Sequence, residues 1–214
     1  MNAKPEVVLD SRAVLWSAKA EELASRPLLV LLHGVGSHEG DLFSLAPHLP
    51  LEPVIASLRA PLPYGSGFSW YDLGTAGDPR SDRVDAAAVA VLAWLDALDP
   101  APSSVALLGF SQGAAVAMQL LRHAPDRFTY AVQLSGYVTA GELPGDAELE
   151  SRRMPVFWGR GNQDPIIPPE AIARTAEWLP DHSDLDARIY EGVGHSVSQP
   201  ELADVIAFIR RNSV

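Results

Sequence analysis

Cysteine is absent from this 214-residue sequence. Its absence excludes disulfide bonds, thiolate metal sites and cysteine nucleophiles together. Positive charge is also scarce, because 16 Lys and Arg residues stand against 27 Asp and Glu residues and leave a formal net charge of -11. A surface of this sign repels phosphate backbones and anionic lipid headgroups. We therefore expect neither nucleic-acid binding nor stable membrane association.

Long apolar runs are absent as well. No run approaches the ~20 residues that a membrane-spanning helix needs. The N-terminal sequence MNAKPEVVLDSR meets acidic residues before any long apolar stretch, so it does not resemble a secretory signal, and we expect a cytoplasmic protein. Hydrophobic residues nevertheless make up 47% of the chain and charged residues 20%. This composition is typical of an ordered globular protein, and the length suits one domain over residues 1–214.

Short apolar runs alternate along the chain with longer segments of helical periodicity. We expect strands at residues 6–16, 28–33, 54–58, 105–109, 130–134, 156–159 and 185–190. Runs such as PLLVLLH lack polar alternation, which is typical of strands covered on both faces. The first segment contains charges and favours an edge strand or a hairpin. Apolar stripes and Pro boundaries predict helices at residues 82–97, 112–123, 169–178 and 200–211.

This alternation predicts βαβ units, and therefore an α/β fold with a mostly parallel, doubly wound sheet flanked by helices. Two connections are long, residues 59–80 and 135–155, and loops of that length often bind ligands or form small lids. Neither is long enough for a large helical cap domain. We therefore expect an open, shallow site.

The segment Gly109-Phe110-Ser111-Gln112-Gly113 joins an expected strand to an expected helix. A GxSxG pattern at such a junction indicates a nucleophilic serine, because a tight, strained turn exposes the hydroxyl and needs small neighbours. The turn also aims backbone N–H groups at the anion that forms during acyl transfer. The alternative is a Gly-Ser-Gly turn without catalytic meaning.

A serine nucleophile needs a base, and in folds of this kind the acid and then the base follow it along the chain. Three histidines follow Ser111. His123 lies late in an expected helix, and His182 lies in a polar turn. His195 follows a strand and precedes the last helix. It therefore lies on a loop at the carboxyl end of a strand, which is where ligands bind in open α/β sheets. His195 is therefore the candidate base, with a loop histidine of no catalytic role as the alternative.

Asp164 is the candidate orienting acid. A Gly-rich turn carries it just beyond the buried strand expected at residues 156–159. Asp186 and Glu191 flank a different strand. The alternative for Asp164 is a turn-forming role ahead of Pro165.

The segment His33-Gly34-Val35-Gly36 follows an apolar strand, where a glycine-rich loop is expected to supply an oxyanion donor. We assign the oxyanion hole to the backbone N–H groups of Val35 and Gln112, and we expect their side chains to matter less than their backbone geometry. Losing one such donor typically costs ~3 kcal/mol of transition-state stabilisation. We interpret His33 as a structural residue that holds the loop.

Nearly the whole chain resembles the phospholipase/carboxylesterase family of α/β-hydrolases, which includes bacterial carboxylesterases and acyl-protein thioesterases. The likeness runs, in the family's order, through LLHGVGSHEGDLFSLAPHL, GFSQGAAVAMQLL, VQLSGY, FWGRGNQDPIIPP and GVGHSV. Residues 37–41 (SHEGD) are closer to the bacterial carboxylesterases than to the HGLGD form of the thioesterases. The resemblance implies a serine hydrolase with the triad Ser111, Asp164 and His195, and no metal or organic cofactor.

The resemblance also places the connection 59–80 beside the acyl pocket. We nominate Trp70 and Leu73 there as substrate-binding residues, although these side chains could equally pack the loop onto the body. Ile167 and Val197 are further apolar candidates, because they shortly follow the candidate acid and base. The expected substrates are small molecules, namely short- to medium-chain carboxylic esters such as nitrophenyl or naphthyl acetate and butyrate.

Two other functions are compatible with this sequence. A lysophospholipase or an acyl-thioester hydrolase would use the same triad on a different substrate. A non-catalytic binding protein on the same scaffold is more remote, because such proteins usually lack a triad residue and all three are present here. A homodimer is a further expectation, without an identified interface.

Overall fold

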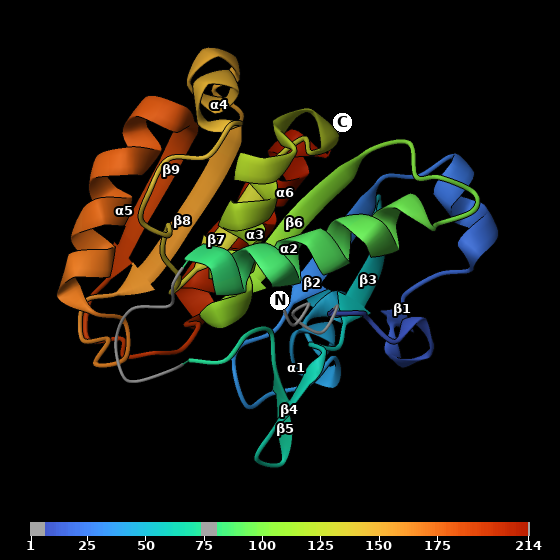
Figure 1. Ribbon diagram of the computed structural model, residues 1–214, viewed down its shortest axis with the longest axis horizontal. Helices are drawn as coiled ribbons and strands as arrows, with labels where there is room; N and C mark the ends of the chain where they lie inside the picture. The colour runs from blue at the N-terminus through green and yellow to red at the C-terminus, as the bar shows by residue number, and fades with distance from the viewer. Residues whose placement is uncertain (1–6, 74–80, 214) are drawn as a thin grey trace, which may run out of the picture.

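The computed structural model describes residues 7–73 and 81–213 (Figure 1). Within these residues, one seven-stranded sheet has the order β1-β3-β2-β6-β7-β8-β9. Its strands are β1 (Leu15–Trp16), β2 (Leu28–Leu32), β3 (Val54–Leu58), β6 (Val105–Phe110), β7 (Ala131–Leu134), β8 (Pro155–Gly161) and β9 (Asp184–Tyr190). The edge strand β1 is antiparallel to β3, and the other neighbouring pairs are parallel.

Helices cover both faces of this sheet. They are α1 (Gly40–Phe43), α2 (Ser81–Asp96), α3 (Gln112–His123), α4 (Asp146–Arg152), α5 (Pro169–His182) and α6 (Gln199–Asn212). Helices α2, α3 and α5 contribute to the core on one face, and α1 and α6 to the core on the other. Figure 1 shows α2 and α3 in front of the sheet and α6 behind it. The expected mostly parallel sheet flanked by helices is confirmed.

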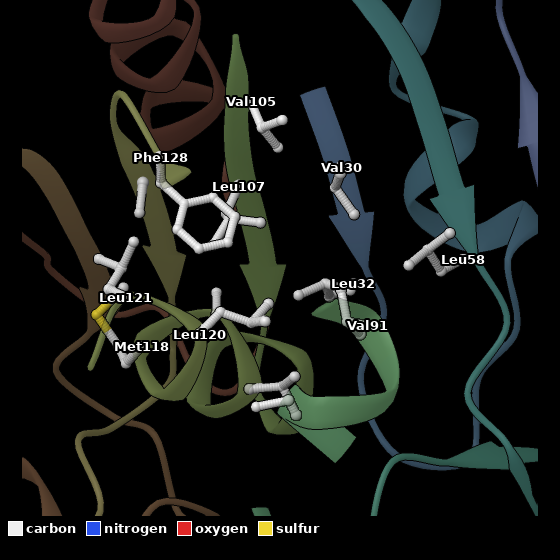
Figure 2. Packing of buried hydrophobic residues seen from close by; sticks show 14 of the residues in the cluster. Val30, Leu32, Leu58, Val91, Val105, Leu107, Met118, Leu120, Leu121 and Phe128 are labelled. Atoms are coloured by element: carbon white, nitrogen blue, oxygen red, sulfur yellow. The ribbon is translucent and has the colours of Figure 1, made fainter. Parts of the chain in front are cut away.

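The central strands have no polar face because both of their faces are buried. In β2, Leu28, Val30 and Leu32 point into the core under α2 and α3, whereas Leu29 and Leu31 point into the core under α6. All five side chains are fully buried. Figure 2 shows the first of these cores, where side chains of β2, β6, α2 and α3 meet. The uninterrupted apolar runs of the sequence follow from this burial.

The direction in which the chain adds strands to the sheet reverses at β2. The chain passes from β2 outward to β3, and then returns to place β6 on the other side of β2. Ligands in open α/β sheets bind at the carboxyl ends of strands at such a switch point. The loop after β2 and the turn after β6 therefore share the position at which this topology forms a binding crevice.

The N-terminal strand is much shorter than expected. Of residues 6–16, Leu15–Trp16 alone forms strand β1, and Ser11–Ala13 is a 3-10 helix. Residue 6 lies outside the described residues. The Asp10 side chain accepts hydrogen bonds from the backbone and the guanidinium of Arg12, and this local pairing favours a turn over an extended strand.

Each long connection carries a small element that the sequence did not indicate. The hairpin of β4 (Leu62–Tyr64) and β5 (Gly67–Ser69) lies in the connection 59–80, of which residues 74–80 are outside the described part. Helix α4 lies in the connection 135–155. None of the described helices is long and apolar enough to cross a membrane.

Candidate active site

Ser111 occupies a strained turn between β6 and α3. Its backbone has φ 55° and ψ -116°, a region that costs a residue with a side chain of order 1–3 kcal/mol. The flanking glycines make the turn sterically feasible. A Cβ on Gly109 would lie 2.4 Å from the Gly113 carbonyl oxygen, and a Cβ on Gly113 would lie 2.0 Å from the Leu32 carbonyl oxygen. Both glycine positions of the GxSxG pattern therefore exclude any side chain.

Ser111, His195 and Asp164 form one hydrogen-bonded chain. The Ser111 Oγ lies 2.8 Å from His195 Nε2, and His195 Nδ1 lies 2.7 Å from Asp164 Oδ2. Because a carboxylate accepts hydrogen bonds, the proton of neutral His195 belongs on Nδ1. Nε2 then accepts from the serine hydroxyl, which is the arrangement that general-base activation of a serine needs.

Asp164 forms a turn and also holds the histidine. Its Oδ1 accepts hydrogen bonds from the backbone N–H groups of Ile166 (2.8 Å) and Ile167 (3.3 Å), while Oδ2 faces His195. The side chain is 2% exposed. The sequence left a turn-forming role and an orienting role as alternatives, and in the structure the two carboxylate oxygens serve one role each.

The loops that carry Asp164 and His195 are fastened to each other. The Gln163 N–H donates to the Val193 carbonyl at 2.9 Å, and a Cβ on Gly161 would lie 1.9 Å from that same carbonyl oxygen. The ring of Phe110 packs against the ring of His195 with centroids 5.0 Å apart. The Phe110 ring and the Asp164 carboxylate both contact the imidazole and therefore restrict its orientation.

The loop after β2 lies directly against the nucleophile. A Cβ on Gly34 would lie 3.5 Å from Ser111 Cβ. Within the described part of the chain, the backbone N–H groups of Val35 and Gln112 have no protein acceptor. These two donors thus remain free for an oxygen atom of a ligand.

His33 fixes the conformation of this loop. Its Nε2 accepts the backbone N–H of Ala60 at 3.1 Å, so in the neutral ring the proton lies on Nδ1 and is donated to the Gly34 carbonyl at 2.7 Å. Burial lowers the pKa of His33. That carbonyl belongs to the same peptide unit as the Val35 N–H, and a trans peptide directs the two groups oppositely. A neutral His33 therefore sets the direction of the Val35 N–H.

The Gln112 side chain makes hydrogen bonds that the sequence did not predict. Its Oε1 accepts the Trp70 N–H at 2.8 Å, and its Nε2 donates to the Tyr71 carbonyl at 2.8 Å and to Ser69 Oγ at 3.0 Å. The amide thus ties the segment 69–71 to the nucleophile turn. Sequence patterns assign Gln112 a backbone role alone, because its partners lie about forty residues away along the chain.

The four candidate pocket residues occupy different environments. Trp70 is 1% exposed, and its Nε1 donates to the His33 carbonyl at 2.8 Å, so the indole supports the loop from within. Leu73 is 36% exposed at the end of a described segment. Ile167 packs in a small buried cluster with Ala115, Tyr137 and Ala171. Val197 lines a cavity that reaches His195.

A pair of tyrosines joins the two long connections beside the site. The hydroxyl oxygens of Tyr71 and Tyr137 lie 2.6 Å apart, and both side chains are buried. Burial raises the pKa of Tyr71 well above its ordinary value. No local sequence pattern pairs these two residues, because they lie 66 positions apart in the chain.

A mostly parallel sheet with a serine nucleophile turn at its switch point defines an α/β-hydrolase. Residues 17–213 match the phospholipase/carboxylesterase family, and the chain belongs to that family. It is therefore a serine hydrolase, as the sequence resemblance implied.

Two relatives from other organisms align with this chain over most of their length. Acyl-protein thioesterase 1 of Kluyveromyces lactis is 26% identical, over 93% of this chain and 96% of the relative. Esterase YpfH of Escherichia coli is 25% identical, over 87% and 83%. The crystal structure of esterase PE8 superposes with a TM-score of 0.77 at 24% identity, covers 96% of this chain and all of the other, and shares the fold.

Proposed function

We propose that the chain is a serine carboxylesterase that cleaves short- to medium-chain carboxylic esters through an acyl-enzyme intermediate. The hydrogen-bonded chain from Ser111 through His195 to Asp164 is the observation that carries this proposal. Its three residues come from the ends of different strands, and their hydrogen-bond distances fit the geometry that acyl transfer needs. The family to which the chain belongs supports hydrolysis of ester or thioester bonds.

In this mechanism His195 Nε2 takes the hydroxyl proton as Ser111 Oγ attacks the ester carbonyl carbon. The resulting oxyanion accepts hydrogen bonds from the Val35 and Gln112 backbone N–H groups. The C–O bond to the alcohol then breaks, and the alcohol leaves with the proton held by His195. Water then attacks the acyl carbon while His195 takes its proton. The bond to Ser111 Oγ breaks, His195 returns the proton to Ser111, and the carboxylic acid leaves. Asp164 stays ionised and stabilises the imidazolium.

The first test is hydrolysis of 4-nitrophenyl esters from acetate to palmitate by the purified protein, beside a Ser111→Ala control. We expect a peak at short to medium chains and a loss of at least about 10^4-fold in the control. Asp164→Asn should lose a comparable factor, because it favours the wrong histidine tautomer. A peak at palmitate, or hydrolysis that survives in Ser111→Ala, would contradict the proposal.

An acyl-thioester hydrolase or lysophospholipase is the second candidate. The name of the thioesterase relative, which spans nearly the whole chain, favours thioesters in particular. The same triad would serve, so comparing kcat/KM for matched oxygen esters and thioesters, and for a lysophospholipid, separates the three activities. A small-molecule ester substrate, a cytoplasmic location and a homodimer remain parts of the proposal that rest on the sequence.

A further inference from the structure

A surface cavity of about 290 Å³ adjoins the triad on one side. Leu42, on α1, and Leu45, shortly after α1, contribute to its lining. Phe110, at the end of β6, and Val197, in the loop before α6, contribute as well. Since a cavity of about 150 Å³ can bind benzene, this space accommodates a single aromatic ring.

The position of the cavity assigns it to one half of an ester. Among the described residues that line it is His195, but neither Ser111 nor Asp164. In the tetrahedral intermediate the acyl chain and the alcohol oxygen are both bonded to the carbon that Ser111 Oγ attacks. Of these two groups, the departing alcohol oxygen must lie within hydrogen-bond reach of His195 Nε2, which protonates it. A cavity that adjoins His195 is therefore placed for the alcohol.

The lining selects for chemical class. Leu42 is 5% exposed, and Leu45, Phe110 and Val197 pack on the core, so these four side chains give the lining a mainly apolar surface. Ser44, Ser196 and His195 are its uncharged polar members. Asp41, at the rim, carries the one permanent charge among the described residues of the lining, and the Ser37 hydroxyl donates to it at 2.6 Å. A negative rim on a chain of net charge -11 repels anionic groups.

We propose that the cavity between α1 and the loop 195–197 is the leaving-group subsite, and that it takes a neutral, apolar alcohol of up to about one aromatic ring. This inference rests on the proposed esterase function. If the cavity has this role, the enzyme should prefer ethyl and benzyl esters over esters whose alcohol carries a carboxylate or a phosphate.

The test separates the two halves of the substrate. One series keeps the acetyl group and changes the alcohol from ethanol to benzyl alcohol. The other keeps ethanol and lengthens the acyl group from acetyl to octanoyl. All acetates form the same acetyl-enzyme, so the alcohol affects acylation and leaves deacylation unchanged. Val197→Phe narrows the cavity, and Val89→Phe makes the same change at a 54% exposed position of α2.

We expect Val197→Phe to lower the ratio of kcat/KM for benzyl acetate over ethyl acetate by about tenfold, the usual effect of overfilling a packed site. The acyl-chain profile and the deacylation rate should keep their wild-type pattern. Leu45→Ala enlarges the cavity and should shift the preference toward a bulkier naphthylmethyl acetate. Val89→Phe should change no ratio.

A changed acyl-chain profile in Val197→Phe with an unchanged benzyl-to-ethyl ratio would assign the cavity to the acyl group and overturn the inference. An equal loss on both series would overturn it too. Failure of the wild type to hydrolyse either series would instead refute the esterase function itself, so the two failures are distinguishable.

The charge of the rim is tested with one pair of substrates, 3-(acetoxymethyl)benzoate and its methyl ester. The wild type should prefer the neutral ester, and Asp41→Asn should reduce that preference about threefold, a typical size for an exposed charge. High salt should reduce this preference more in the wild type than in Asp41→Asn. A preference for the carboxylate would refute the assigned alcohol class.

Discussion

Individual side chains at this site act mainly by fixing the backbone. Trp70 and His33 hold successive peptide units of the loop after β2, through the His33 and Gly34 carbonyls. The Gln112 amide holds the segment 69–71. A preorganised donor is worth more in catalysis than one that must be reoriented during the reaction. We therefore expect these three side chains to affect the rate through the backbone they hold, without themselves contacting the substrate.

His33→Ala tests this at the residue scale. Without the imidazole, the Gly34–Val35 peptide loses its restraint, and we expect kcat for 4-nitrophenyl butyrate to fall roughly tenfold to a hundredfold with little change in KM. His33→Asn keeps a donor near the position of Nδ1 and should recover part of the rate.

A tetrahedral-intermediate mimic provides the control for His33. Affinity for a trifluoromethyl ketone should fall in parallel with kcat/KM, because both depend on the oxyanion donors. A His33→Ala variant that melts at a lower temperature but keeps its kcat and its affinity for the ketone would show that the histidine is only structural.

At the scale of elements, Arg122 fastens the connection 135–155 to helix α3. The guanidinium is fully buried, and it donates to both carboxylate oxygens of Asp146 at 2.7 Å and to the carbonyls of Thr139 and Gly141. The guanidinium fork suits this set of acceptors, which Lys could not satisfy in the same way. A segment without long strands or helices is therefore held in one conformation beside the active site.

Arg122→Met should destabilise the fold by about 3–5 kcal/mol, because it leaves the Asp146 carboxylate without its cation. The double variant with Asp146→Leu should recover part of this loss. Urea unfolding measures both. Arg152→Met, which breaks an exposed pair with Glu148 on α4, is the matched control and should change stability by less than about 1 kcal/mol. Equal losses in the two single variants would contradict this account.

Glu201 couples the stability of the whole molecule to pH. The residue is fully buried on α6, and its Oε1 has no hydrogen-bond partner in the described part of the chain. Burial raises its pKa from 4.5 to about 7. The folded state then binds more protons than the unfolded state between these values. This group's contribution is therefore favourable below about pH 4.5 and is lost as pH rises through about 7.

Glu201→Gln removes the ionisation and should remove this pH dependence. The variant should be more stable than the wild type by about 1–3 kcal/mol at pH 8, and close to it at pH 4.5. Denaturant unfolding at both pH values measures the difference, with the exposed Glu150→Gln as control. A stability difference that is the same at both pH values would show that the wild-type carboxyl does not titrate in this range.

The sequence by itself determined the parallel sheet and most of its strands. Burial on both faces gives β2, β6 and β8 their apolar runs, and these patterns are local. The two glycines around Ser111 predicted the nucleophile turn, because a side chain at either position would clash with a backbone oxygen. Ser111, Asp164 and His195 could be picked out from the sequence because each follows a recognisable strand.

Only the tertiary structure decided which side chains meet around that frame. Trp70 is buried against the His33 carbonyl, the Gln112 amide bonds to the segment 69–71, and the hydroxyls of Tyr71 and Tyr137 meet. These contacts join positions 37 to 66 residues apart. A periodicity reports which face of an element is apolar, but the partner of a buried polar atom depends on how separate elements pack, and that is fixed only when the chain has folded.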